Sequence, residues 1–376
     1  MNILRRAMPT GGQAPALDAA DALAPPEAGA LPALGRSPWP RFLLAAAALA
    51  ASVIVATSVG PAGIPLDATV RIILSRLPGV EMADTLPPLW RDIIWEVRLP
   101  RVLLAGLTGA VLAMSGATYQ GVFRNPLADP YLIGVATGAA LGATAVIVSG
   151  APHAWHGLSL LPLAAFAGAI TSVVVVYAVA RVGNTLPTTT LILAGVAVAS
   201  FSTAITSFLM LRSTTHTLSV FSVVLGSFNT ATWGDFTWTL PYVLPAAVII
   251  LLHGRLLNVL SLDEEQARQL GVDPERTKLL LLGAASLATA AAVSVAGTIG
   301  FVGLIVPHAV RLLWGPDNRQ LLPMSLLCGA TFLILADLAA RTVDQPAEVP
   351  VGIVTAVCGV PFFLYLLRRA RLGAFW

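Results

Sequence analysis

Charged residues are scarce in this sequence. They make up 11% of its 376 residues, against roughly a quarter in an ordinary soluble domain, and hydrophobic residues make up 56%. So little charge cannot cover the surface of a soluble core. The composition therefore excludes an ordinary soluble domain and favours a polytopic membrane protein.

Lysine is almost absent, since Lys278 is the only one. No Gly-x4-Gly-Lys-Ser/Thr surrounds it, so the chain lacks the loop that cradles nucleotide phosphates and does not hydrolyse ATP by that route. Cys328 and Cys358 both stand in apolar runs, where a free thiol behaves as a small hydrophobe. His153 and His156 lie three apart without a third ligand, so a solvated loop is favoured over a metal site.

Ten segments approach the roughly 20 apolar residues that cross a bilayer as a helix. The sequence therefore predicts an all-α polytopic membrane protein with about ten transmembrane helices. The segments are residues 41–60, 100–122, 131–150, 159–181, 188–211, 236–256, 278–297, 300–314, 321–340 and 351–368. Apart from an external segment at 61–97, the loops between them are short, so no sizeable soluble domain is expected.

Positive charge is distributed unevenly over the predicted loops. With both termini in the cytoplasm, 15 of the 22 Lys and Arg residues lie inside and 7 outside, which favours an even number of helices in that orientation. Residues 1–40 contain seven prolines and no apolar periodicity. They predict a flexible cytoplasmic tail before a transmembrane domain at 41–370, with 41–60 as an uncleaved first helix.

The most polar stretch is Ser261–Lys278, which holds five acidic residues and the single lysine. In a membrane protein such a stretch must lie in water, and its charge favours a docking surface over a plain turn. Ser261 or Asp263 can cap a short helix there, acidic residues follow in its first turn, and Gly271 can end it.

Two Gly-rich stretches predict broken or bent helices. In residues 125–142, Gly134, Gly138 and Gly142 are four apart, which places them on one helix face where another backbone can approach. Residues 297–311 also contain three glycines before a proline. Each stretch follows a long helix and leads into a turn, which hints at an inverted repeat. For the glycines alone, ordinary helix packing is the favoured explanation.

The segment 188–211 presents a face of small and hydroxyl residues, Gly195, Ala199, Thr203 and Ser207. Such a face suits the passage of a bulky substrate that is held weakly, and it suits interhelical packing equally well.

Asp337 is the one ionisable residue well inside a predicted span, and Arg341 follows one turn later and can neutralise it. Carriers driven by protons or sodium need buried ionisable relays. A single neutralised carboxylate gives little support to an ion-coupled secondary transporter.

Six motifs follow one another in order over residues 41–370. They are RLPR at 98–101, GAVLAMSGATYQGVFRNPLADPYLIGVATGAALGA at 109–143, LSLDEEQARQLGV at 260–272, GTIGFVGLIVPHAVRLL at 297–313, ILADLAAR at 334–341 and PAEVPVGIVTAVCGVPFF at 346–363. Together they resemble the FecCD family of importer permeases, and only the tail 1–40 is left uncovered.

The resemblance implies a homodimer in a bacterial inner membrane, with ten helices per subunit and a translocation path at the dimer axis. Helices 2–5 and 7–10 would be related by inverted pseudo-symmetry. The partners would be two cytoplasmic ATPase subunits, which bind ATP and Mg²⁺, and a periplasmic substrate-binding protein. This chain would then be a permease that is not an enzyme, binds no cofactor and has no nucleic-acid partner.

The expected cargo is an iron complex, either a siderophore or haem. Cobalamin is the alternative, and an ion-coupled secondary transporter is the less favoured reading.

The resemblance also assigns residue roles, none of them catalytic or metal-binding. Coupling to the ATPase falls to short cytoplasmic helices within 261–277, through Asp263, Glu264, Glu265, Ala267, Arg268, Leu270 and Gly271. Docking of the binding protein falls to Arg98, Arg101 and Arg341. Arg98 and Arg101 stand at a helix N-terminus, where the dipole disfavours positive charge, so stability of that helix does not explain them. The path is expected along Ala199, Thr203 and Ser207, with an external gate at Ser219–Thr230.

Overall fold

The computed structural model describes residues 38–76, 86–151, 154–155, 158–183, 185–212, 217–262, 264–345 and 347–370, and almost all of them are helical. A short ribbon pairs β1 (Ala154–Trp155) with β2 (Leu158–Ser159). The predicted tail up to residue 37, and both histidines of the 153–156 pair, lie outside the described residues. The helices are α1 (Trp39–Ser58), α2 (Leu66–Leu74), α3 (Pro88–Asp92), the π-helical turn η2 (Ile93–Arg98), α4 (Leu99–Phe123), the 3-10 turn η3 (Pro130–Ile133), α5 (Val135–Ser149), α6 (Leu160–Ala180), α7 (Thr188–Arg212), α8 (Thr217–Leu225), α9 (Trp233–Leu252), α10 (Gly254–Leu260), α11 (Glu264–Gln269), α12 (Pro274–Ala296), α13 (Val302–Trp314), α14 (Asn318–Ala340) and α15 (Val351–Ala370).

Each of the ten predicted spans corresponds to a helix. Seven helices in the described ranges are long and apolar enough to cross a membrane: α1, the continuous rod Pro88–Phe123, α6, α7, α9, α12 and α14. Three further apolar helices, α5, α13 and the Val351–Tyr365 part of α15, are shorter. The prediction of an all-α polytopic membrane protein is confirmed.

The segment at 61–97, for which no elements were predicted, contains α2, α3 and η2. Ile64, Ala68, Ile72 and Ile94 form a small apolar core of their own there. The segment is also tied to the main bundle, because the indole of Trp233, at the start of α9, donates a hydrogen bond to the Trp95 carbonyl at 2.7 Å.

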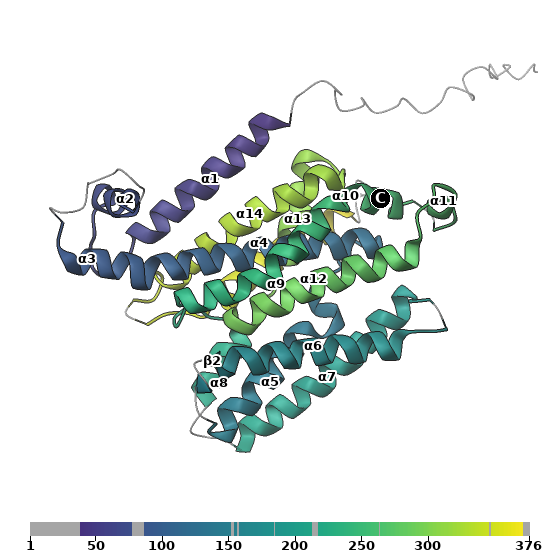
Figure 1. The fold of residues 1–376 in the computed structure, drawn as a ribbon, viewed down its shortest axis with the longest axis horizontal. Coiled ribbons are helices and arrows are strands. Elements are labelled where there is room, and N and C mark those ends of the chain that lie inside the picture. Colours follow the sequence, from purple (N-terminus) through teal and green to yellow (C-terminus); the bar gives the residue numbers. More distant parts are fainter. Residues whose placement is uncertain are drawn as a thin grey trace, which may run out of the picture. The chain divides into compact units, whose positions relative to one another are not determined.

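Helices α4 and α12 are the most buried spans, and they pack against each other in the middle of the bundle (Figure 1). Helix α4 also approaches α13 closely. A Cβ at Gly116 would lie 1.9 Å from the carbonyl oxygen of Gly303, so only glycine fits at this crossing.

The predicted repeat relates helices 2–5, which are α4 to α7, to helices 7–10, which are α12 to α15. The packing contacts between these helices follow this correspondence. Helix α4 packs on α13 and α14, and its counterpart α12 packs on α5 and α6. The pairs α5–α6 and α6–α7 likewise have counterparts in α13–α14 and α14–α15. The hint of duplication in the sequence thus has a counterpart in the packing.

Only two of the three spaced glycines of residues 125–142 stand on the predicted helix, although all three approach α6. Gly134 precedes α5 with φ 77°, where it ends η3 in the left-handed conformation. The other two lie on the packed face, because a Cβ at Gly138 or Gly142 would come within 2.5 Å of a carbonyl oxygen of α6. Gly134 also faces α6, because a Cβ there would lie 2.7 Å from the Ser172 hydroxyl oxygen. The spacing thus identified the side that packs on α6, although Gly134 stands in the tight turn before the helix.

Candidate functional site

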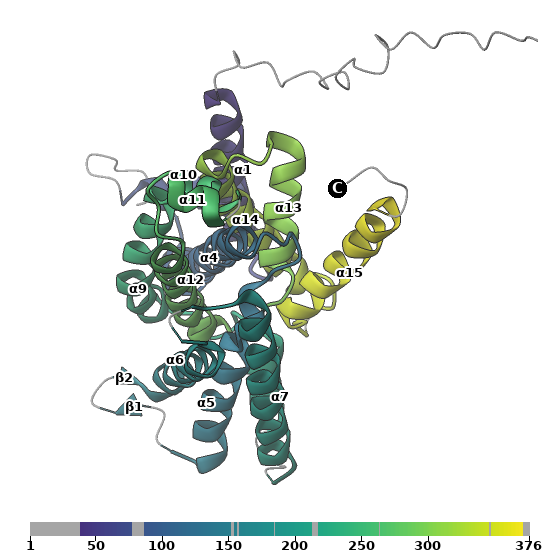
Figure 2. The same cartoon turned by 90° about the vertical axis from the view of Figure 1, so that its right-hand side faces the viewer.

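A cavity of about 900 Å³ lies among α5, α7, α8, α15 and the segment 298–301 that precedes α13. Figure 2 shows α7 and α15 on the same side of the bundle. The cavity wall is apolar with a few hydroxyl groups, and none of its described lining residues carries a formal charge. These residues are Tyr131, Ala136, Thr137, Ala140, Thr203, Thr206, Ser207, Met210, Val224, Leu225, Thr298, Gly300, Phe301, Gly352, Ile353, Ala356, Val357, Val360 and Pro361.

The predicted path residues lie along this cavity and a neighbouring one. Thr203 and Ser207 line the large cavity, and Ala199 lines a second cavity of about 600 Å³. Thr203 and Tyr131 belong to both walls. The part of this face from Ala199 to Ser207 therefore faces open space in the described chain. Gly195, on the same face, packs on η3 instead, since a Cβ there would lie 1.9 Å from the Leu132 carbonyl oxygen.

Sequence reasoning missed the wall that α15 supplies. Gly352, Ala356 and Val360 recur at four-residue spacing along α15, and all three line the large cavity. The same four-residue spacing of small residues predicted the path-lining face of α7. Applied to residues 351–368, it would have found this wall too.

Two helix breaks meet at the cavity. Asp129 caps η3 by accepting a hydrogen bond from the Tyr131 amide at 2.8 Å. The Tyr131 hydroxyl in turn donates to the Ile299 carbonyl at 2.9 Å and accepts from the Ile299 amide at 3.0 Å. Phe301, with φ 69°, is the left-handed residue from which α13 starts. The breaks predicted from the glycines are thus joined by one phenol.

The predicted gate, Ser219–Thr230, lies against the same breaks. Gly226 ends α8 with φ 71°, and the Ser227 amide donates to the Ala296 carbonyl at 3.0 Å. The Val351 amide, at the start of α15, donates to the Gly226 carbonyl at 3.1 Å. The segment therefore connects the end of α12 to the start of α15, and its role as a gate stays a prediction.

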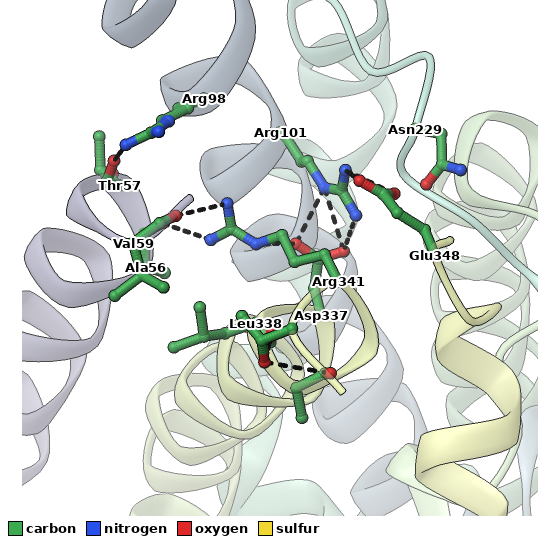
Figure 3. A network of polar contacts seen from close by, with 12 residues as sticks. Ala56, Thr57, Val59, Arg98, Arg101, Asn229, Asp337, Leu338, Arg341 and Glu348 are labelled. Carbon is green, nitrogen blue, oxygen red and sulfur yellow. Dashed lines mark hydrogen bonds and ion pairs between the residues drawn. The ribbon is translucent and has the colours of Figure 1, made fainter. Parts of the chain in front are cut away.

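Arg98 and Arg341 both bind the C-terminal end of α1 (Figure 3). Arg98, only 5% exposed, donates to the carbonyls of Thr57 and Ser58 at 3.0 and 2.7 Å. Arg341 donates to the carbonyls of Ala56 and Val59. The last carbonyls of a helix lack intrahelical partners and attract positive charge, so these arginines stabilise α1 and not the helix on which Arg98 stands.

Arg101 lies between two carboxylates (Figure 3). Its Nη2 is 2.8 Å from Asp337 Oδ1, and its Nη1 is 2.9 Å from Glu348 Oε2. The Asp337 side chain is 2% exposed and that of Glu348 is 33% exposed. The pair of Asp337 with Arg341 is present at 3.7 Å, but Arg101 is the closer partner of Asp337 and was not predicted. These five residues, Arg98, Arg101, Asp337, Arg341 and Glu348, are called the arginine network below. Binding of an acidic partner by its arginines stays a prediction.

The polar stretch 261–278 contains α11, which is shorter than the stretch predicted to be helical. Ser261 does not cap α11 but ends α10, since its hydroxyl donates to the Asn258 carbonyl at 2.6 Å. Asp263, the other candidate cap, lies outside the described residues. Gly271, with φ 80°, follows α11 as predicted. Among the predicted coupling residues Ala267 is fully buried, whereas Glu265, Arg268 and Leu270 are exposed.

A model of the FecCD transport family matches residues 48–369 of this chain. The chain is 49% identical over 282 residues to the cobalamin import system permease protein BtuC of Halobacterium salinarum, and the match covers 75% of each chain. It is 41% identical over 288 residues to the hemin transport system permease protein HmuU of Yersinia pestis, which covers 74% of this chain and 85% of that protein.

A solved structure has the same fold. It is an inward-facing conformation of an ABC transporter assigned to the metal-chelate type, and it superposes with a TM-score of 0.76 at 32% sequence identity. The match covers 88% of this chain and 99% of that one.

Proposed function

The chain belongs to the FecCD transport family, and we propose that its cargo is a corrinoid of the cobalamin class. It is the multi-pass permease subunit of an ABC importer for iron chelates, haem or cobalamin, and it is not itself catalytic. ATP is bound by a separate subunit, in agreement with the missing phosphate loop.

The observation that carries the corrinoid proposal is the uncharged wall of the large cavity. Haem carries two carboxylates, which a cationic lining would accommodate better, whereas cobalamin is large and has no carboxylate. Thr203, Ser207 and Thr298 offer hydroxyl groups, and the rest of the wall is apolar apart from Tyr131, Thr137 and Thr206. Such a wall contacts a bulky amide-rich ligand without holding it tightly. The 49% identity to a cobalamin permease points the same way.

This proposal reverses the order of cargo expected from the sequence, in which an iron complex came first. Iron–siderophore and haem remain the second candidates, since the haemin permease is 41% identical.

Uptake of defined cargo tests the choice. The permease, assembled with its ATPase and its binding protein in proteoliposomes, should accumulate labelled cyanocobalamin when ATP is supplied, and an excess of haemin should not compete. ATP-dependent accumulation of haemin or of a ferric siderophore, without that of cyanocobalamin, would replace the corrinoid by an iron complex.

We further propose a homodimer whose path runs between the α7 and α15 walls, because both walls face open space in the single chain. The two ATPase subunits would bind at α11, where exposed Glu265, Arg268 and Leu270 surround the buried Ala267. Both termini would lie in the cytoplasm, as the arginine distribution favours.

The substrate-binding protein would dock at the arginine network, at the opposite end of α4 from the cytoplasmic loops. Arg101 is the best placed of the three predicted arginines, because one of its two carboxylate partners, Glu348, is accessible to solvent. Arg98 and Arg341 would contribute mainly by holding α1 in place.

A further inference from the structure

The loop that joins α6 to α7 is bound directly to the first turn of α12. The amide of Leu186 donates a hydrogen bond to Glu275 Oε2 at 3.1 Å, across 89 residues of sequence. The other carboxylate oxygen, Oε1, lies 3.7 Å from the Lys278 ammonium. The Glu275 side chain is 22% exposed, so this carboxylate is largely enclosed between the two groups.

Glu275 follows closely in the chain after α11, the helix to which the ATPase contact is assigned. The Gly271 amide donates to the Arg268 carbonyl at 2.9 Å, and the Val272 amide donates to the Ala267 carbonyl at 3.1 Å. This is the Schellman pattern of a helix C-terminus, and Gly271 supplies its left-handed residue.

Helix α12 follows after a single further residue. Asp273 caps α12 by accepting from the amides of Glu275 and Arg276 at 3.1 and 3.2 Å. Only the peptide bond between Val272 and Asp273 separates these two hydrogen-bonded helix ends. A shift of α11 therefore reaches Glu275 over a very short connection.

On its other side the hydrogen bond reaches the start of α7. Pro187 follows Leu186, and α7 begins at Thr188. The Thr190 hydroxyl donates to the carbonyls of Ala180 and Pro187 at 3.0 and 2.9 Å, which holds the first turn of α7 to the end of α6. Helix α7 then continues without a break, so Thr203 lies about 22 Å along the same rod.

The main packing partners of the two helices differ. Helix α12 packs on α4, α6 and α9, whereas α7 packs on α5, α6 and η3. The hydrogen bond from Glu275 to Leu186 is therefore a direct connection between two helices that otherwise communicate mainly through α6 (Figure 1).

We propose that Glu275 is a positioning residue that transmits the movement of α11 to the cavity wall of α7. This rests on the proposed function, in which the ATPase binds α11 and α7 lines the path. When the ATPase moves α11, the Glu275 carboxylate pulls or releases the Leu186 amide, and the start of α7 follows. Because α7 is one rod, its tilt changes the width of the cavity at Thr203 and Ser207.

Three variants and a control separate this role from a general effect of charge or folding. Glu275→Gln keeps an oxygen that accepts from Leu186, whereas Glu275→Ala removes it. Leu186→Pro removes the donor from the other side and leaves Glu275 intact. Arg276→Ala is the matched control, because Arg276 lies in the same turn with its side chain 90% exposed. Its ion pair with Asp273, at 3.1 Å, is exposed to solvent and contributes little to stability.

The first readout uses a cysteine at Ser207 in the complete transporter, with Cys328 and Cys358 replaced by serine. Its reaction rate with a water-soluble thiol reagent is measured without nucleotide and with Mg-ATP trapped by vanadate. We expect the two rates to differ by about tenfold in the parent, in Glu275→Gln and in Arg276→Ala, and to converge in Glu275→Ala and Leu186→Pro while ATP hydrolysis persists. A parent-like ratio in both Glu275→Ala and Leu186→Pro overturns the proposal.

The second readout is hydrogen exchange of the peptide amides at 183–190 in the same complexes. ATPase binding should change the exchange of this loop in the parent and not in Glu275→Ala. In the parent, the Ser207 cysteine could react at the same rate with and without trapped Mg-ATP while the hydrogen exchange of the 183–190 loop changes on ATPase binding. That result would reject the assigned path and support the Glu275 connection. A loop that does not respond in the parent overturns the connection itself.

Discussion

Arg101 and Asp337 form an ion pair that joins the first turn of α4 to the last turn of α14, across 236 residues of sequence. The contact is 2.8 Å long, and the two side chains are 12% and 2% exposed. These helices also pack against each other along their lengths. The pair therefore fixes the relative position of two core helices at one end of the bundle.

Replacing Asp337 by alanine should destabilise the permease by about 3 kcal/mol, because it leaves Arg101 and Arg341 without their buried carboxylate. Denaturant or thermal unfolding in detergent would measure the change. Asp344→Ala, at an exposed position in the loop after α14, is the control and should stay within about 0.5 kcal/mol of the parent. Equal destabilisation by the two changes would contradict a structural role of the Arg101 pair.

Glu348→Gln should strengthen binding of the substrate-binding protein by about threefold to tenfold. The reason is that Glu348 occupies Arg101 and competes with an acidic residue of the partner. The gain should shrink as salt is raised, since an exposed interaction is screened. Binding would be measured by surface plasmon resonance on nanodiscs at low and moderate salt.

Asp344→Asn makes the same change of charge in the same loop and is the control for Glu348→Gln. If both variants gain the same affinity for the binding protein, the cause is the general loss of negative charge and not the release of Arg101. If Glu348→Gln binds more weakly than the parent, Glu348 is itself a docking group.

Thr203→Trp should reduce cargo uptake by about a hundredfold while ATP hydrolysis continues, because the indole fills space that both cavities share. Leu193→Trp places the same indole at an exposed position of α7 that lines neither cavity. It should transport at nearly the parental rate. Uptake by Thr203→Trp at the parental rate would place the path elsewhere.

Gly116→Ala should destabilise the fold by about 2–3 kcal/mol, since the new Cβ would lie 1.9 Å from the Gly303 carbonyl oxygen and would force α4 away from α13. Gly283→Ala is the matched control. No atom lies within 4 Å of its added Cβ, so it should be neutral or stabilising by up to about 1 kcal/mol. A comparison of the two unfolding midpoints decides whether the close approach sets the packing.

Burial raises the pKa of the Asp129 carboxyl from 3.8 to about 6, although the hydrogen bond from the Tyr131 amide acts in the opposite direction. The native state then binds the proton more tightly than the unfolded state. Its contribution to stability is present below about pH 4 and is lost as the pH rises to about 6. Asp129→Asn keeps a capping oxygen without the charge, so the stability curve between these pH values should flatten. An unchanged slope would contradict this.

Helix positions followed from the sequence because the thickness of a bilayer sets the length of an apolar segment. The face of Thr203 and Ser207 on α7 followed in the same way, since helix periodicity alone decides which residues share a face. Gly271 ends its helix because glycine takes the left-handed conformation without cost, a property of the residue and not of its surroundings. These are local features, readable over one or a few helical turns.

The partners of the arginines could not be read in this way. Arg98 stabilises the carbonyl end of α1, some 40 residues earlier in the chain. The dipole of its own helix therefore does not explain its position. Arg101 meets Asp337 and Glu348, and Glu275 meets Leu186, only because distant helices lie side by side. A helix that is apolar almost all round does not record in its sequence which face turns inward. The sequence by itself therefore determined the helices, their lengths and their small-residue faces, whereas the tertiary packing alone decided which charges pair and which two faces enclose the cavity.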